Sequence, residues 1–255
     1  MASLYMARLF LPGPLSAGSL DLPRDVVRHV QALRLRVGDD LTVFDGLGGE
    51  WQSVLVSPPP AARVELVRHA AIERELPSHV TLAVGMPANE RMDWLAEKAT
   101  ELGAAQVQPL MTARSVLRLD GERAARRAAH WQAVAQAACE QCGRNRLPHI
   151  AVPTRLDAWL AGLPAAGDGS GTAGRCLLAA PGDGQALPFA TWAAGLTSSQ
   201  NLLALSGPEG GLDLDEIAWA QSAGFVAVSL GPRVLRAETA PLALLAALTA
   251  RAPLD

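Results

Sequence analysis

Two segments near the end of the chain combine glycine, proline and charged side chains. They are LSGPEGG at residues 205–211 and LGPRVLRAET at residues 230–239. Each follows a short apolar run, 201–205 or 225–230, that predicts a buried strand, and each leads into a helical pattern. Glycine lets backbone approach a ligand closely, and proline fixes the turn. Two such strand ends predict a ligand crevice at the carboxyl edge of an α/β sheet. Two tight strand-to-helix loops that bind no ligand fit the same residues equally well.

A second spacing that could support chemistry is the pair Cys139 and Cys142, one helical turn apart. Two cysteines at this spacing can form half of a zinc site or a redox pair. The pair lies in a helical pattern, without a second pair nearby, and the third cysteine, Cys176, is remote. We therefore favour buried helix cysteines, and the three residues do not form a disulfide framework.

Composition and charge limit the class of protein. Of the 255 residues, 49% are hydrophobic and 18% are charged, which is typical of a globular enzyme with one large or two modest domains. The net charge is −3, and the 22 basic residues are all arginine except Lys98. No apolar run approaches the length of a membrane span, and the start of the chain lacks a signal-peptide pattern, so we expect a cytoplasmic protein. A local basic face can still bind nucleic acid, and the first forty residues contain Arg8, Arg24, Arg28, Arg34 and Arg36.

The first 72 residues predict a β-rich domain with one helix at 23–35, which has proline near its first turn. Several short strands that close on themselves suggest a small barrel. The expected strands are 5–11, 40–44, 51–56 and 63–70. A domain boundary is expected between 72 and 78, where charged residues and Pro77 replace the periodic pattern.

From residue 73 the chain alternates strand and helix patterns, which predicts a largely parallel sheet. The expected strands are 80–85, 107–111, 176–180 and the two runs before the glycine-proline turns. The expected helices are 90–102, 122–142, 156–160, 213–223 and 241–250. The last helix is apolar almost all round, so we expect it to be buried on every side or to lie against a partner subunit.

The glycine-proline segments belong to a longer series of motifs. The others are RMDWLAEKATELG at 91–103, RSV at 114–116 and CEQCGR at 139–144. In these residues and this order the chain resembles the 16S ribosomal RNA (uracil N3)-methyltransferase family, within the SPOUT class of knotted methyltransferases. The resemblance covers nearly the whole chain, and the motifs together are specific although each alone is weak.

The resemblance implies a PUA-like β-barrel RNA-binding domain at 1–72. It implies an α/β domain with a trefoil knot, a mostly parallel sheet and helices on both faces at 73–255. Such enzymes are homodimers that use S-adenosylmethionine, without a metal, on 16S ribosomal RNA or the small ribosomal subunit. Two residues depart from the family pattern: Ala237 replaces a common threonine, and Pro241 replaces a common alanine. Since proline is tolerated in the first turn of a helix, we expect Pro241 to move the helix start without breaking it.

The same resemblance implies roles for individual residues. Arg236 would stabilise negative charge on the uracil, since a guanidinium is a fixed fork of donors. Glu238 would hold Arg236, accept the N3 proton or act as a structural carboxylate at a helix N-terminus, and Glu209 would hold its turn through backbone N–H groups. The expected cofactor-binding residues are Leu178, Ala179, Gly207, Pro208, Gly210, Gly211, Leu230, Gly231 and Leu235. The expected RNA-binding residues are Arg8, Arg34, Arg114 and Arg144.

Two other classes of protein share some of these sequence features with a methyltransferase. A non-catalytic RNA-binding or ribosome assembly factor could retain the same fold, but the intact glycine loops and Arg236 argue against it. A dinucleotide-dependent enzyme would also place glycine turns after strands. The chain has neither G-x-G-x-x-G nor a phosphate-loop Gly-Lys-Ser/Thr, which makes that class a poor match.

Overall fold

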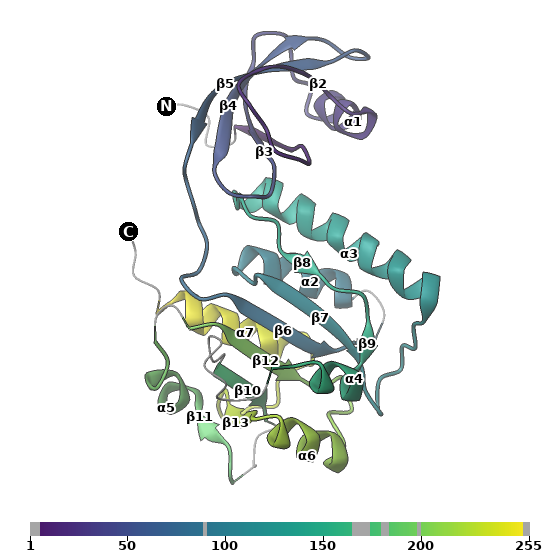
Figure 1. Ribbon diagram of the computed structural model, residues 1–255, viewed down its shortest axis with the longest axis vertical. Helices are drawn as coiled ribbons and strands as arrows, with labels where there is room; N and C mark the ends of the chain where they lie inside the picture. The colour runs from purple at the N-terminus through teal and green to yellow at the C-terminus, as the bar shows by residue number, and fades with distance from the viewer. Residues whose placement is uncertain (1–5, 89–90, 165–173, 180–183, 198–199, 252–255) are drawn as a thin grey trace. The chain divides into compact units, whose positions relative to one another are not determined.

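The computed structural model describes residues 6–88, 91–164, 174–179, 184–197 and 200–251 (Figure 1). The chain forms two compact units. The N-terminal unit is Met1–Glu75 with Gln136–Leu147, and the C-terminal unit is Leu76–Ala135 with Pro148–Asp255. The division passes through one long helix, α3 (Gly121–Cys142), whose last residues belong to the N-terminal unit.

The N-terminal unit contains a mixed five-stranded sheet. In spatial order its strands are β1 (Ala7–Phe10), β3 (Asp40–Phe44), β4 (Glu50–Ser57), β5 (Arg63–Ala70) and β2 (Gly18–Asp21). β1 pairs with β3 in parallel, and the other neighbours are antiparallel. Leu9, Leu55 and Val64 are fully buried and form a core with Val30 of α1 (Arg24–Ala32).

Two elements of this unit differ from the sequence prediction. The helix expected at 23–35 ends at Ala32, because Arg34 adopts a left-handed φ of 57° that an α-helix cannot include. Strand β2 was not anticipated, since GSLD has no β-branched or aromatic side chain to indicate a strand. Tyr5, the start of the expected strand 5–11, lies outside the described residues.

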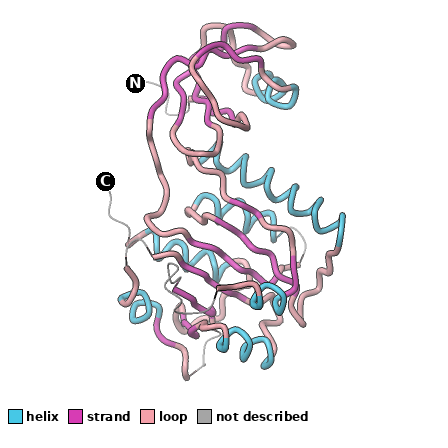
Figure 2. Tube along the Cα trace, in the orientation of Figure 1, coloured by secondary structure: helices cyan, strands magenta, loops and turns pink. Residues whose placement is uncertain are grey.

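The described strands of the C-terminal unit form one eight-stranded sheet, whose strands are magenta in Figure 2. Every pairing in this sheet is parallel. The order is β11 (Leu187–Pro188), β13 (Val226–Ser229), β10 (Gly174–Leu178), β12 (Leu202–Ser206), β6 (Val80–Gly85), β7 (Gln106–Met111) and β8 (His149–Ile150), with β9 (Thr154–Arg155) also paired to β7. All residues of β6 are buried, as a central strand covered on both faces requires.

Helices cover both faces of this sheet, as predicted. The side chains of Leu82 and Val84 share a core with α2 (Arg91–Glu101), the first part of α3, α5 (Phe189–Ala194) and α7 (Thr239–Thr249). Ala83, which points to the opposite face, belongs to a second core with α4 (Leu156–Ala161) and α6 (Leu214–Ser222). Parallel strands between two helical layers place their carboxyl ends at one edge of the sheet.

The apolar last helix, α7, packs largely within its own chain. Leu244 and Leu245 are fully buried in the core, and Pro241 and Leu242 are also buried. The helix begins at Thr239, two residues before the expected start. Pro241 occupies the third helical position, where a backbone N–H has no intrahelical acceptor. Among the described helices, none has the length and apolar character needed to cross a bilayer.

Of the two cysteines expected to be buried in a helix, Cys139 is buried and Cys142 is only half-buried. Cys139 lies in α3 and Cys176 in β10, both buried, while Cys142 is half-buried; all three are free. Burial raises the pKa of the Cys139 and Cys176 thiols to about 12. Within the described parts of the chain, no cluster of His, Cys, Asp and Glu has the arrangement of a metal site.

Candidate active site

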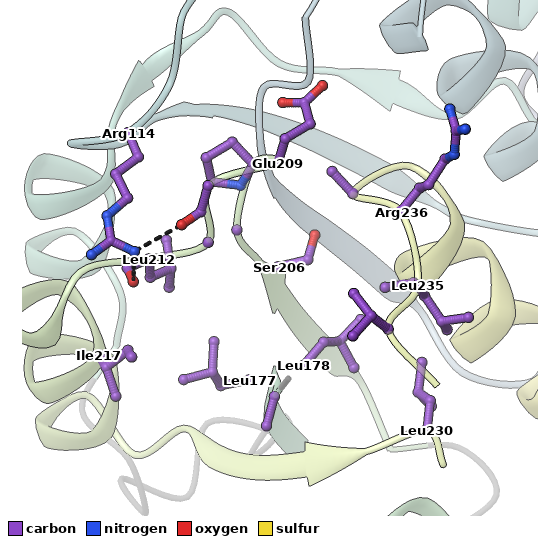
Figure 3. Close-up of a pocket in the computed structure, with 18 of the residues that line it drawn as sticks. Arg114, Leu177, Leu178, Ser206, Glu209, Leu212, Ile217, Leu230, Leu235 and Arg236 are labelled. Atoms are coloured by element: carbon purple, nitrogen blue, oxygen red, sulfur yellow. Dashed lines mark hydrogen bonds between the residues drawn. The ribbon is translucent and has the colours of Figure 1, made fainter. Parts of the chain in front are cut away.

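A cavity of about 750 Å³ lies at the carboxyl ends of β10, β12 and β13 (Figure 3). Three loops form it: 177–179, 206–212 and 230–237. All nine residues expected to bind the cofactor line this cavity, and Arg114 and Arg236 line it as well. The two glycine-proline turns, ambiguous in the sequence, therefore form two walls of one pocket.

The Gly207 turn is closed on itself. A Cβ atom at Gly207 would lie 2.8 Å from the backbone of Gly211 and Leu212, so no larger residue fits. The Gly211 N–H donates to the Pro208 carbonyl over 2.8 Å, and Gly211 has a left-handed φ of 69°. The sequence suggested that this glycine lets a ligand approach, whereas here it lets the loop backbone pack against itself.

Two charged side chains fix this loop from outside. The Arg114 Nη1 atom donates to the carbonyls of Gly210 and Leu212 over 2.8 and 3.4 Å. The Glu209 Oε1 atom accepts from the Ala88 N–H and from Arg91 Nη1, each over 3.0 Å. Glu209 therefore holds the segment after β6, and not its own turn as expected. Arg114, expected to contact RNA, has its guanidinium on the loop carbonyls.

A buried carboxylate that was not singled out in the sequence supports the same region. Glu216 of α6 forms a reciprocal capping box with Asp213 and also accepts from the Ala113 N–H over 2.6 Å. It thus ties the segment that carries Arg114 to the start of α6. The spacing of Asp213 and Glu216 is a capping-box signal and could have identified this pair.

Arg236 and Glu238 reach different surroundings. Arg236 is exposed on the cavity lining and makes no side-chain hydrogen bond within the described residues. Glu238 is buried and is not part of the described lining; its Oε2 has no hydrogen-bond partner and lies 3.9 Å from Arg91 Nη1. The expected pairing of Glu238 with Arg236 is therefore absent. Glu238 is the N-cap residue of α7, but its side chain does not cap the helix.

The cavity combines an apolar wall with a cationic rim. Leu178, Leu230 and Leu235 are half-buried at the lining, and Figure 3 shows leucines and Ile217 in the lower part of the view with Arg114 and Arg236 on opposite sides. Among the described lining residues, the charged ones are Arg91, Arg114, Glu209, Arg233 and Arg236. An apolar wall suits the faces of a purine ring, and a cationic rim suits an anionic polymer.

Two of the arginines expected to bind RNA form ion pairs within the N-terminal unit, where Arg144 is buried and Arg8 is half-buried. Arg8 Nη1 pairs with Glu50 over 2.8 Å, and Nη2 donates to Asn145 Oδ1 over 2.6 Å. Arg144 pairs with Glu75 and exposes only 4% of its side chain. Both guanidinium groups are thus engaged by groups of the protein itself, and their expected contact with RNA stays a prediction. Arg34 is exposed, as that role requires.

Comparisons of the sequence identify relatives along most of the chain. The RNA methyltransferase domain family matches residues 74–249, and the RNA methyltransferase PUA domain family matches residues 22–66. The protein named ribosomal RNA small subunit methyltransferase E in Bacillus subtilis is 30% identical over 239 residues, covering 91% of this chain and 90% of that protein. Its namesake in Synechocystis is 34% identical over 220 residues, covering 86% of this chain and 69% of that protein.

Solved structures agree with these matches. A ribosomal RNA small subunit methyltransferase E from Neisseria gonorrhoeae, bound to S-adenosylmethionine, superimposes with a TM-score of 0.85 at 35% identity, over 96% of this chain and 97% of that chain. A methyltransferase from Legionella pneumophila in complex with the same cofactor gives a TM-score of 0.86 at 30% identity, over 97% and 98%. The chain therefore belongs to the RNA methyltransferase family, with a SPOUT-type α/β domain preceded by a PUA-like domain.

Proposed function

We propose that this protein transfers a methyl group from S-adenosylmethionine to N3 of a specific uridine in 16S ribosomal RNA of the small subunit. The observation that carries the proposal is the convergence of three loops on one cavity lined by all nine expected cofactor residues. Similar proteins from Neisseria gonorrhoeae and Legionella pneumophila were solved with S-adenosylmethionine bound.

The residues of the cavity fit this cofactor. A volume of about 750 Å³ is in the range of small-molecule pockets. The half-buried leucines suit the adenine ring, and backbone groups of the Gly207 and Leu230 loops are available to its polar atoms. When bound, S-adenosylmethionine supplies a methyl group on a sulfonium, whose direct displacement by N3 leaves S-adenosylhomocysteine. Since that displacement needs no metal, we expect methyl transfer to continue in the presence of a chelator.

Arginine side chains would activate the uracil. Its N3 carries a proton, and loss of this proton spreads negative charge onto O2 and O4. Nearby guanidinium groups favour an anion, and the exposed Arg236 makes no side-chain hydrogen bond to the residues that the structure describes. We do not retain Glu238 as the proton acceptor, because its carboxylate is buried outside the described lining. We therefore propose that the N3 proton is released to water and that cationic stabilisation of the resulting anion by Arg236 carries the activation.

We also propose the division into an RNA-binding domain at 1–72 and a methyltransferase domain at 73–255. The family matches at 22–66 and 74–249 fall on either side of this boundary. Exposed Arg34 is our choice for an RNA contact in the first domain, since Arg8 and Arg144 are committed to carboxylates. A cytoplasmic homodimer is proposed in addition, and light scattering after gel filtration tests the dimer by its mass.

Two measurements test the proposed function. Calorimetry of the purified protein should give saturable binding of S-adenosylmethionine, and well-folded protein without binding would contradict the proposal. Mass mapping of 16S ribosomal RNA should find one N3-methyluridine that disappears when the gene is deleted and returns when the gene is restored. Unchanged methylation in the deletion strain would favour an assembly factor instead.

A further inference from the structure

Within the described residues, the buried hydroxyl group of Ser206, the last residue of β12, has no hydrogen-bond partner. The residue is only 4% exposed, and its Oγ makes no hydrogen bond to any described residue. Ser206 lines the candidate cofactor cavity. Figure 3 shows its side chain in the middle of the cavity wall, among the leucines and below Glu209 in the view.

An unpaired buried hydroxyl is unusual, since buried polar groups are nearly always hydrogen-bonded. Two other buried side-chain atoms of the described chain share this property, Arg8 Nε and Glu238 Oε2, but neither residue belongs to the described lining of the cavity. Ser206 lies within the parallel ladder, opposite Val84 of β6. Its hydroxyl is therefore free to serve a ligand in the cavity.

We propose that the Ser206 hydroxyl hydrogen-bonds to the nucleoside part of S-adenosylmethionine; this role rests on the proposed function. Leu177 and Leu178 lie below Ser206 in Figure 3 and Leu235 lies beside it, and these apolar side chains suit an apolar ring. The charged lining residues belong to loops or to the start of α2, and they suit the charged amino-acid part of the cofactor. A hydroxyl both donates and accepts, so it pairs with a purine nitrogen or a ribose hydroxyl.

The variant Ser206→Ala separates a ligand contact from a structural role. Calorimetry should show affinity for S-adenosylhomocysteine reduced roughly 3- to 10-fold, the loss expected for one neutral hydrogen bond. Methylthioadenosine, which keeps the nucleoside but lacks the amino-acid part, should lose affinity by the same factor. The melting temperature of the ligand-free variant should equal or exceed that of the wild type, because alanine removes an unsatisfied buried hydroxyl.

Ser53 provides a matched control. It is also a buried serine, 3% exposed, but its Oγ donates to the Trp51 carbonyl over 3.2 Å in the N-terminal unit. Ser53→Ala should leave the affinity for both ligands unchanged.

Several outcomes would overturn the role of Ser206. Wild-type affinity for both ligands in Ser206→Ala would exclude the contact, and loss of ligand-free stability alone would assign the residue to the core. Weaker binding of S-adenosylhomocysteine with unchanged binding of methylthioadenosine would move the contact to the amino-acid part. If the wild-type protein binds neither ligand, the proposed function itself fails, and this role fails with it.

Discussion

Arg236 and Glu238 are two residues apart, yet the structure gives them different environments. Arg236 lies on the cavity lining, while Glu238 is buried at the start of α7, 3.9 Å from Arg91. The motif that contains both residues therefore combines a side chain on the cavity lining with a carboxylate that is buried in the protein. Arg91 contacts both Glu209 and Glu238, so these carboxylates act on the position of α2 and the Gly207 loop.

Replacing Arg236 should impair methyl transfer much more than cofactor binding. Removal of one group that stabilises developing charge costs on the order of 100-fold in rate, so Arg236→Ala should lose roughly that factor in single-turnover transfer. Its affinity for S-adenosylhomocysteine should stay close to that of the wild type. Arg236→Lys should recover only part of the rate, since lysine keeps the charge without the fork of donors.

Arg123 of α3 is a suitable control for this variant, because it is exposed and is not a described lining residue of the cavity. Arg123→Ala should leave the transfer rate unchanged. Equal losses of rate and cofactor affinity in Arg236→Ala would reassign Arg236 to the cofactor pocket.

The cysteines should differ in reactivity. Burial raises the pKa of Cys139 and Cys176 to about 12, so both remain protonated thiols at neutral pH. We expect iodoacetamide to label at most Cys142 in the native protein and all three residues in urea. Peptide mass spectrometry measures this directly, and rapid native labelling of Cys139 or Cys176 would show that the helix or the sheet opens locally.

The sequence could identify the glycine loops of the site but not the environment of each polar side chain. Glycine and proline are local signals, and both turns lie where they were predicted. Arg8 and Asn145 are 137 residues apart in the chain, and no local pattern indicates that they will be hydrogen-bonded. Likewise, a serine in a strand has the same appearance in the sequence whether its hydroxyl is hydrogen-bonded, like that of Ser53, or lacks a partner among the described residues, like that of Ser206.

At the scale of elements, α6 and the segment before α3 depend on one carboxylate. Glu216 closes the capping box of α6 and accepts from the Ala113 N–H. Glu216→Ala should lower the free energy of unfolding by about 2 kcal/mol, because the capping box is lost and the Ala113 N–H loses its carboxylate acceptor. It should also weaken cofactor binding, since Arg114, next to Ala113, holds the Gly207 loop.

Chemical denaturation measures this loss. The control is Asp215→Ala, which changes an exposed acidic residue in the same first turn. Its effect should stay within about 1 kcal/mol, the size of a helix-dipole contribution. Equal effects of the two variants would mean that the buried contacts of Glu216 add nothing.

Longer elements were predictable because their side chains repeat. The buried residues Met92, Leu95 and Ala99 of α2 follow the helical spacing, and the helix extends over Arg91–Glu101 as expected. Strands β8, β9 and β11 contain two residues each, which is too short for any alternation. These short strands form because the backbone groups of a neighbouring strand are available for pairing. That availability depends on the sheet and not on the side chains of the segment itself.

At the scale of the whole molecule, charge pairs join two distant segments into the N-terminal unit. Glu50 accepts from Arg8 and Arg74, and Arg74 also donates to the Gly143 carbonyl over 2.8 Å. Burial alone would raise the pKa of Glu50, but the hydrogen bonds from Arg74 and Arg8 outweigh burial and hold the pKa below its usual value. Truncating one partner would leave a largely buried charge unpaired, which is costly.

Stability should therefore fall in acid partly through Glu50. A carboxyl with a lowered folded-state pKa stabilises the protein above its unfolded-state pKa, and this contribution is lost as the pH falls through the folded-state value. Glu50→Gln should be less stable than the wild type at neutral pH and should lose less stability between about pH 5 and pH 3. Urea denaturation across this range measures both effects, and parallel pH profiles would exclude a role for Glu50.

The charged form of Glu140 in α3 has the opposite effect on the stability of the fold. Burial raises its pKa, so its charged form destabilises the fold at neutral pH. Glu140→Gln should be at least as stable as the wild type there, because glutamine keeps an oxygen for the Phe10 N–H. A clear loss of stability at neutral pH would contradict this.

The two-part organisation could be predicted from the sequence only up to a point. The expected change near residues 72–78 coincides with the end of the first segment at Glu75. The inclusion of Gln136–Leu147 in the N-terminal unit could not be anticipated, because α3 continues through residue 136 without a break in its helical pattern.

Because Gln136–Leu147 belongs to the N-terminal unit, this unit cannot be completed early in synthesis on the ribosome. Met1–Glu75 is made before Gln136–Leu147, which follows only after translation of the intervening residues, a delay of ~3–12 s at usual elongation rates. Until then Arg8 and Ile72 lack the Asn145 side chain that each contacts in the finished protein. The unit that is begun first is thus completed only after β6, β7 and most of α3 have been made, and a nascent chain that stops at residue 75 remains an incomplete fold.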